Sequence, residues 1–158
     1  MNQPPASGTL FGHPKGLFLL FSTEMWERFS YYGMRALLIL TLVAATESTN
    51  PGFGLGHGDA LLLYGYYTGL VYAATLFGGL IADNLLGQRK SIILGGTLMA
   101  IGQFTLFAAT PHSMSLFYVG LGFIIAGNGL FKPNISAIVG DLYPQGDARR
   151  DGGFTIFY

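Results

Sequence analysis

Residues 116–139 have the sequence LFYVGLGFIIAGNGLFKPNISAIV, which contains a single charged side chain, Lys132. The hydrocarbon core of a bilayer is about 30 Å thick, and an α-helix needs roughly 20 mainly apolar residues to cross it. This stretch is long enough and apolar enough to do so. It therefore predicts a membrane-spanning helix.

Similar apolar runs occur on the N-terminal side of this stretch, and one more begins after it. Turn-forming residues separate them, among them Asn50-Pro51-Gly52 and Thr110-Pro111. We expect an all-α, polytopic membrane helix bundle that is incomplete, preceded by a polar tail at residues 1–15 without a signal peptide. The bundle, 16–158, would have helices at about 16–45, 60–82, 91–109 and 116–139, and the start of a fifth from about 154. The expected connections are 46–58, 110–115 and 141–153.

The composition supports a membrane protein. Hydrophobic residues make up 51% of the chain and charged residues only 10%, whereas soluble domains carry about a quarter charged residues. Glycine is abundant, with 24 residues, and small residues let membrane helices approach closely. Eight basic residues balance eight acidic ones, which argues against nucleic acid as a partner. The absence of cysteine excludes disulfides and thiolate metal ligands, and we expect no metal or cofactor.

The loop charges predict the orientation of the helices. Five basic residues lie in the N-terminal flank, in the connection between the second and third helices, and in the connection between the fourth and fifth. An even number of membrane crossings places these segments on one side. The residues are Lys15, Arg89, Lys90, Arg149 and Arg150. The loops on the other side contain no Lys or Arg. By the positive-inside rule, we expect the N-terminus and these connections in the cytoplasm.

Charged residues also occur inside the first and fourth runs, where charge is costly. At the centre of a membrane helix an ionised side chain costs about 2.5–3.5 kcal/mol, so these residues should face one another or water. On the first run the spacing i, i+3, i+4, i+7 and i+11 places five residues on one helix face, with Tyr32 at its edge. These five are Glu24, Glu27, Arg28, Tyr31 and Arg35.

Two interpretations of this charged face remain open. It could be an internal salt-bridge cluster that fixes helix packing. It could instead be part of an ion pathway, because opposite charge and dehydration shift the pKa of a buried Glu in opposite directions. A change in helix spacing would then switch the group between proton-loaded and ion-paired forms. The concentration of charge favours the pathway.

In the fourth run, Lys132 lies between two glycines and a proline. Gly127 and Gly129 permit close helix approach, and we interpret the pairs Gly95-Gly96 and Gly120-x-Gly122 in the same way. Pro133 removes a helix donor, which predicts a helix defect beside the lysine, as in the interrupted helices that line transporter cavities. The alternative is that Lys132 extends along the helix to the membrane surface.

Three motifs together resemble one family. Residues 24–35, EMWERFSYYGMR, resemble the ExxER-F-x-Y-Y-G signature of the proton-dependent oligopeptide transporters, a branch of the major facilitator superfamily. Residues 79–90, GLIADNLLGQRK, resemble that superfamily's cytoplasmic gating motif. Residues 127–134, GNGLFKPN, resemble the fourth-helix signature of the peptide transporters, and residues 154–158 resemble the start of their fifth-helix motif. The resemblance covers nearly the whole chain.

The resemblance implies the N-terminal part of a major facilitator superfamily fold and symport of protons with di- and tripeptides across the inner cell membrane. It implies a monomer, and a complete protein with more helices than this chain, which should not transport alone. By motif position, Glu24 and Glu27 would relay the proton and pair with Arg28 and Lys132. The peptide-binding residues would be Tyr31, Arg35, Lys132 and, in the second helix, Tyr72. The gating motif would comprise Gly79, Asp83, Gly87, Arg89 and Lys90.

Some features limit the resemblance, and other functions remain open. Some animal members of the family have a functional His where this chain has Gly65, and we expect the nearby His57 to be an exposed loop residue. A related anion transporter would tend to lack parts of the ExxER motif, which is intact here. A membrane enzyme is disfavoured because the three histidines fall outside the expected helices and far apart. A non-transporting assembly protein remains an alternative.

Overall fold

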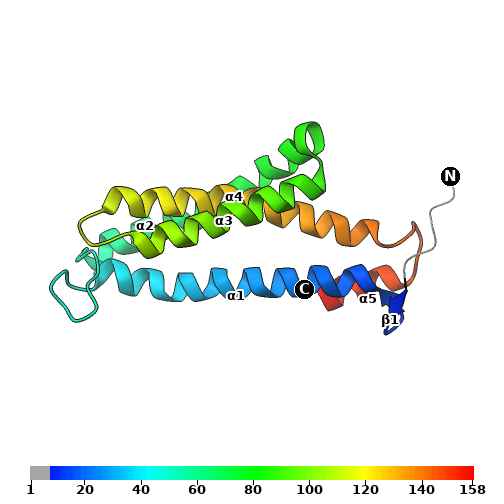
Figure 1. Ribbon diagram of the computed structural model, residues 1–158, viewed down its shortest axis with the longest axis horizontal. Coiled ribbons are helices and arrows are strands. Elements are labelled where there is room, and N and C mark those ends of the chain that lie inside the picture. The colour runs from blue at the N-terminus through cyan, green and yellow to red at the C-terminus, as the bar shows by residue number, and fades with distance from the viewer. Residues whose placement is uncertain (1–7) are drawn as a thin grey trace. The chain divides into compact units, whose positions relative to one another are not determined.

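The computed structural model describes residues 8–158, and most of them are helical (Figure 1). A short antiparallel hairpin, β1 (Thr9–Leu10) and β2 (His13–Pro14), precedes the first helix. The helices are α1 (Lys15–Val43), α2 (His57–Ile81) with its π-helical continuation η1 (Ala82–Leu86), α3 (Gln88–Ala108), α4 (Met114–Asp141) and α5 (Arg149–Phe157). The predicted all-α class is confirmed.

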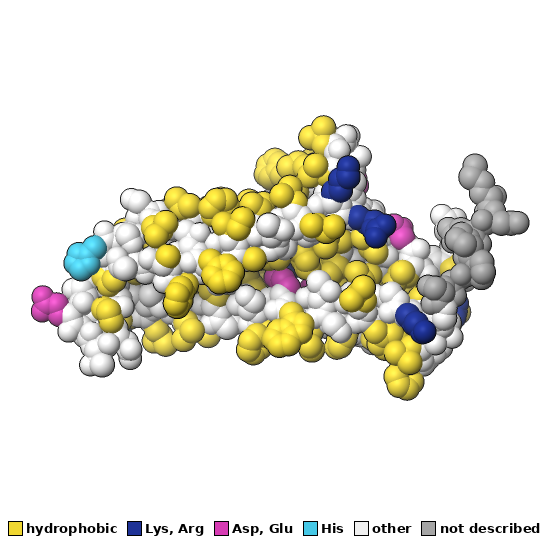
Figure 2. All heavy atoms as spheres, in the orientation of Figure 1, with side chains coloured by type: hydrophobic (Ala, Val, Ile, Leu, Met, Phe, Trp, Pro, Cys, Tyr) yellow, Lys and Arg dark blue, Asp and Glu magenta, His cyan; other side chains and the backbone are white. Residues whose placement is uncertain are grey.

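Three of these helices are long and apolar enough to cross a membrane: α2 with η1, α3 and α4. Helix α1 has 29 residues but is not one of the three, and it carries Glu24, Glu27, Arg28 and Arg35. Its membrane crossing therefore stays a prediction. Figure 2 shows hydrophobic side chains spread over the surface of the helices. Trp26, Phe77 and Phe104 are large hydrophobic residues that are more than half exposed. Such surfaces suit contact with lipid.

Several predicted boundaries were wrong. The polar tail was predicted at residues 1–15 without any secondary-structure element, but residues 9–14 form the hairpin and α1 begins at Lys15; residues 1–7 lie outside the described part of the chain. Its turn has positive φ at both Phe11 and Gly12, which is typical of tight two-residue hairpins. His57 is exposed as expected but is the first residue of α2 rather than a loop residue. Helix α5 begins at Arg149, not at about 154.

The chain divides into two compact units. The terminal unit contains the described residues up to Tyr31 and residues Ile135–Tyr158, and the central unit contains Tyr32–Asn134. Helices α1 and α4 each contribute residues to both units.

In the central unit, glycines bring α4 close to α2 and α3. A Cβ atom added to Gly127 would lie 2.6 Å from the carbonyl oxygen of Gly95 in α3, and one added to Gly129 would lie 2.7 Å from that of Ala74 in α2. The interpretation of Gly127 and Gly129 as packing residues is confirmed. It was wrong for Gly96 and Gly122, where an added Cβ would meet no atom within 4 Å.

We expect Gly129→Ala to lower the free energy of unfolding by about 1–3 kcal/mol, the usual effect of overpacking, because the backbone of Ala74 cannot move aside easily. Gly122→Ala is the matched control on the same helix. It should leave stability unchanged or raise it slightly, since alanine is the better helix former. Denaturant unfolding in mixed micelles measures both. Equal stability of the two variants would contradict the close packing of α2 and α4.

Helix α4 continues through Pro133, so the defect predicted beside Lys132 is a missing N–H donor and not a break in the helix. Proline has no N–H group to donate to the carbonyl of Gly129, but the helix passes this point without a break. The side-chain amide of the next residue, Asn134, donates to the carbonyl of Leu130 at 2.7 Å, which adds a hydrogen bond to the following turn. A single missing hydrogen bond is thus tolerated inside a long helix.

In the terminal unit, the hairpin contacts the connection between α4 and α5. The His13 ring nitrogen Nδ1 lies 2.8 Å from the hydroxyl of Tyr143, which is 5% exposed. Arg149 donates from Nη1 to the carbonyl of Gly12 at 3.0 Å. Gly153 of α5 packs directly against the Tyr143 ring, where a Cβ atom would collide. Burial of Tyr143 raises its pKa above the usual value.

Asp147 explains the early start of α5. Its Oδ1 accepts hydrogen bonds from the backbone N–H and Nε of Arg149, at 2.9 and 3.0 Å, and its Oδ2 lies 2.7 Å from Arg149 Nη2. These bonds satisfy a donor that the helix itself leaves unpaired. The side-chain and then the backbone hydrogen bond from Arg149 lower the pKa of Asp147 to about 2.

The lowered pKa of Asp147 predicts the pH dependence of the start of α5. Because the folded pKa is about 2 and the ordinary value is 3.8, the ionised carboxylate stabilises this turn above pH 3.8. This contribution is lost as the pH falls through the folded pKa. NMR titration of the Asp147 carboxyl should show the lowered midpoint. Asp147→Asn should weaken amide protection at the start of α5 at neutral pH, whereas the nearby control Asp151→Asn should not. An ordinary midpoint for Asp147 would contradict this.

Candidate functional site

The charged face of α1 contains an ion pair. Arg28 Nε donates to Glu24 Oε1 at 2.9 Å, one helical turn away. Glu24 is 3% exposed and Glu27 is 8% exposed. The other oxygen of Glu24, Oε2, is buried and has no hydrogen-bond partner among residues 8–158. The expectation that charges on this face meet one another is confirmed for Glu24 and Arg28.

The basic residues are less buried than the sequence suggested. The Arg28 side chain is 34% exposed, and Arg35 and Lys132 are half-buried. Of the five charged residues in the first and fourth predicted helices, only the two glutamates are buried. Long basic side chains can carry their charged ends toward more open surroundings. Tyr31 is buried, whereas Tyr32 is 54% exposed.

Two residues that the sequence did not single out extend the Glu24–Arg28 pair. The Arg28 guanidinium lies 5.6 Å from the centre of the Tyr158 ring, beside α5. The Tyr158 hydroxyl is 2.8 Å from the hydroxyl of Ser136 in α4. This chain of contacts joins α1, α5 and α4 within the terminal unit. Contacts between side chains this far apart in sequence leave no local pattern by which they could be found.

In the central unit, Arg35 of α1 contacts Tyr64 of α2. The Tyr64 hydroxyl accepts a hydrogen bond from Arg35 Nε at 2.8 Å and a second one from Nη2. The guanidinium carbon also lies 5.2 Å from the centre of the Tyr64 ring, within the range of cation–π attraction. Tyr64 was not a sequence candidate. It holds Arg35 through both its oxygen and its ring.

The predicted gating motif surrounds a π-helical turn that was not expected. Asp83 lies in η1 (Ala82–Leu86), and Gly87 ends this turn with a positive φ of 75°. Its N–H donates to the carbonyl of Ala82 at 2.8 Å. Only glycine adopts such a backbone readily. Asp83, Arg89 and Lys90 are all exposed at this junction.

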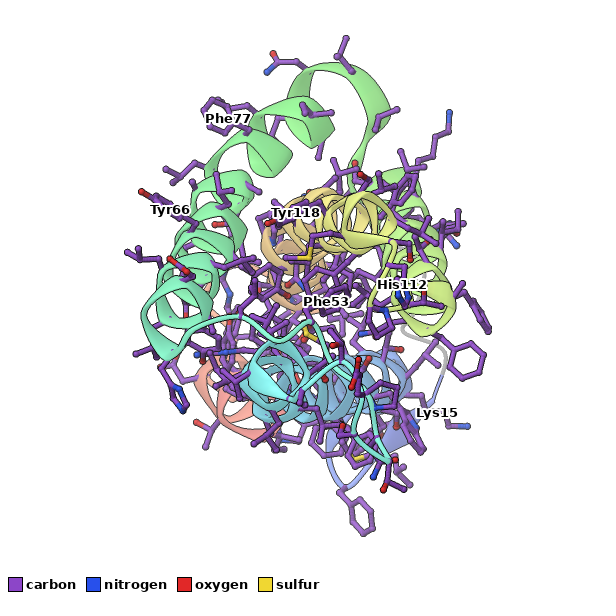
Figure 3. All side chains as sticks on the ribbon, turned by 90° about the vertical axis from the view of Figure 1, so that its left-hand side faces the viewer. Lys15, Phe53, Tyr66, Phe77, His112 and Tyr118 are labelled. Carbon is purple, nitrogen blue, oxygen red and sulfur yellow. The ribbon has the colours of Figure 1, made fainter. Side chains whose placement is uncertain are left out.

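A pocket of about 580 Å³ lies between α2 and α4 in the central unit. Its polar lining groups are Asp59, Tyr66, Tyr67 and Tyr118, and leucines supply most of the rest. In Figure 3, Tyr66 projects outward from α2 and Tyr118 lies between α2 and α4. The predicted peptide-site residue Tyr72 does not line this pocket and is 64% exposed. No group of three or more His, Asp or Glu side chains in residues 8–158 is placed to hold a metal ion.

The sequence and the fold both match known transporters. Residues 89–158 match the POT family. A di-/tripeptide transporter of Lactococcus lactis subsp. lactis is 51% identical over 94% of the chain. The chain is therefore similar to POT-family transporters over most of its length. A peptide transporter of Yersinia enterocolitica, YePEPT, is 48% identical to this chain over 98% of the chain's length.

Solved structures of POT transporters have the same helix arrangement. A crystal structure of a peptide transporter POT in complex with sulfate aligns with 98% of the chain at a TM-score of 0.89 and 46% identity. The expected membrane helix bundle, as part of a larger transporter fold, is confirmed. The chain spans about 30% of the length of this structure and of the relatives it matches.

Proposed function

We propose that the protein to which this chain belongs is a proton-coupled symporter of di- and tripeptides, and that it is not an enzyme. The observation that carries the proposal is the 51% identity to a di-/tripeptide transporter along 94% of the chain. The identical fold of POT structures, one of them solved with a thioalcohol-conjugated peptide, supports it. The chain would supply about a third of the transporter.

The proton-coupling role is assigned to Glu24, Glu27 and Arg28. A buried carboxylate beside a guanidinium is ionised when paired, and becomes easier to protonate when the pair separates. Glu24 has one oxygen in such a pair and a second, buried oxygen without a partner in the described chain. The contact of the Arg28 guanidinium with the Tyr158 ring does not depend on the charge of Glu24, so it can hold the guanidinium when the proton is bound. We assign Lys132 to the same step.

The peptide-binding role is assigned to Arg35 and Lys132, which would attract the C-terminal carboxylate, with Tyr31 and Tyr72 against the peptide. Arginine binds carboxylates through two parallel N–H groups, which gives both affinity and direction. We also propose that the N-terminus and the junction around Asp83 are cytoplasmic, as the loop charges predict. The protein would act as a monomer in the inner membrane.

The test is peptide-driven proton flux in vesicles that contain the natural full-length protein. Addition of a dipeptide should move protons into the vesicles with the peptide, and the flux should stop without a peptide. Uptake of nitrate without any response to peptides would instead identify a small-anion transporter. Absence of flux with every substrate, in protein shown to be folded, would favour an assembly role.

A further inference from the structure

We infer that Tyr64 is a positioning residue that sets the orientation of Arg35 for the C-terminal carboxylate of the peptide. This inference rests on the proposed function, because it assigns a cause to the carboxylate binding proposed for Arg35. It starts from the two hydrogen bonds between the residues and from the ring of Tyr64, which lies beneath the guanidinium.

The geometry of the contact fixes which part of the guanidinium is held. The Tyr64 oxygen accepts from Nε and Nη2, which form one edge of the planar group. An arginine side chain with this edge held by the Tyr64 oxygen loses much of its rotational freedom before any substrate arrives. Binding groups that are ordered in advance lose less entropy when the ligand binds. Tyr64 therefore strengthens carboxylate binding without touching the substrate itself.

The chain position of Tyr64 makes it a suitable anchor. It lies in α2, and its backbone carbonyl accepts a hydrogen bond from Thr68 one turn further along. Helix α2 is in turn held against α4 by the close contact of Gly78 with the Gly129 backbone. A ring on a packed helix is a more rigid support for a guanidinium than a loop residue would be.

The experiment compares two tyrosines of the same helix in the natural full-length protein. Tyr64→Phe removes the hydroxyl and keeps the ring, and Tyr66→Phe is the control, since Tyr66 is 72% exposed. Competition binding is measured with one dipeptide in two forms, with a free C-terminal carboxylate and with a C-terminal amide. We expect Tyr64→Phe, which removes both hydrogen bonds to Arg35, to weaken binding of the free form roughly two- to tenfold and to leave binding of the amide form unchanged. Tyr66→Phe should match the unsubstituted protein.

A double variant separates this inference from the proposed function. In an Arg35→Ala background, Tyr64→Phe should have no further effect on the preference for the free carboxylate, because the group it positions is gone. If the unsubstituted protein does not prefer the free carboxylate, the assignment of Arg35 is wrong. If the preference depends on Arg35 but not on Tyr64, or if Tyr64→Phe weakens both peptide forms equally, only the inference about Tyr64 is wrong.

Discussion

Glu24→Gln is expected to abolish peptide accumulation driven by a proton gradient. Glutamine has nearly the same size and can still accept a hydrogen bond from Arg28, so the packing of this buried position should survive. It cannot gain or lose a proton, however. A transporter in which Glu24 carries the proton would then still exchange peptide across the membrane but could not use the gradient.

Two assays on vesicles containing the natural full-length protein distinguish gradient-driven accumulation of peptide from peptide exchange. Uptake driven by an inward proton gradient should fall to the level of vesicles without protein. Counterflow, in which labelled peptide exchanges against unlabelled peptide, needs no net proton movement and should persist. Glu47→Gln is the control, because Glu47 is exposed in the connection between α1 and α2. Gradient-driven uptake that survives in Glu24→Gln with its pH dependence intact would remove Glu24 from the proton pathway.

The sequence predicted the helices and the charged face of α1 because both depend on local periodicity. Length and apolarity identify a helix, and the spacing of Glu24, Glu27 and Tyr31 places them on one side of it. The structure confirms that all three are buried. The same reasoning could say which residues share a face, but not which residue of another helix meets them.

Tyr64 shows this limit most clearly. It lies 29 positions from Arg35 in the chain, and their contact depends on how α1 and α2 are rotated about their own axes. The family motif pointed to Tyr72 on the same helix instead. The adjacent glycines Gly95 and Gly96 show the same limit on a smaller scale, since only the rotation of α3 decides that Gly95 is the one against α4.

The hairpin, the π-helical turn and the start of α5 were missed for a different reason. Each depends on one or two residues with special backbone or capping roles, rather than on a repeated pattern. Gly12, Gly87 and Asp147 are the residues concerned. Glycine after an aromatic residue, glycine after an apolar helix end, and aspartate two residues before a helix are each common in loops as well. Their role became visible only with the backbone angles and hydrogen bonds.

Arg35→Ala is expected to have the second large effect, on recognition of the peptide C-terminus. A hydrogen bond to a charged group contributes about 1.5–3 kcal/mol, so binding of a dipeptide with a free carboxylate should weaken by roughly ten- to a hundredfold. A dipeptide with a C-terminal amide has no charge at this position and should bind equally well to both proteins. The variant should therefore lose its preference between the two ligands.

Arg35→Lys tests whether charge alone is sufficient. Lysine keeps the positive charge but cannot offer two parallel N–H groups to a carboxylate. It should recover only part of the preference for the free carboxylate. Full recovery would show that Arg35 attracts the peptide by charge without orienting it, and Tyr64 would then have no positioning role. Unchanged preference in Arg35→Ala would instead leave Lys132 as the carboxylate-binding residue, because it is the other basic side chain assigned to the peptide, and Lys132→Ala should then abolish the preference.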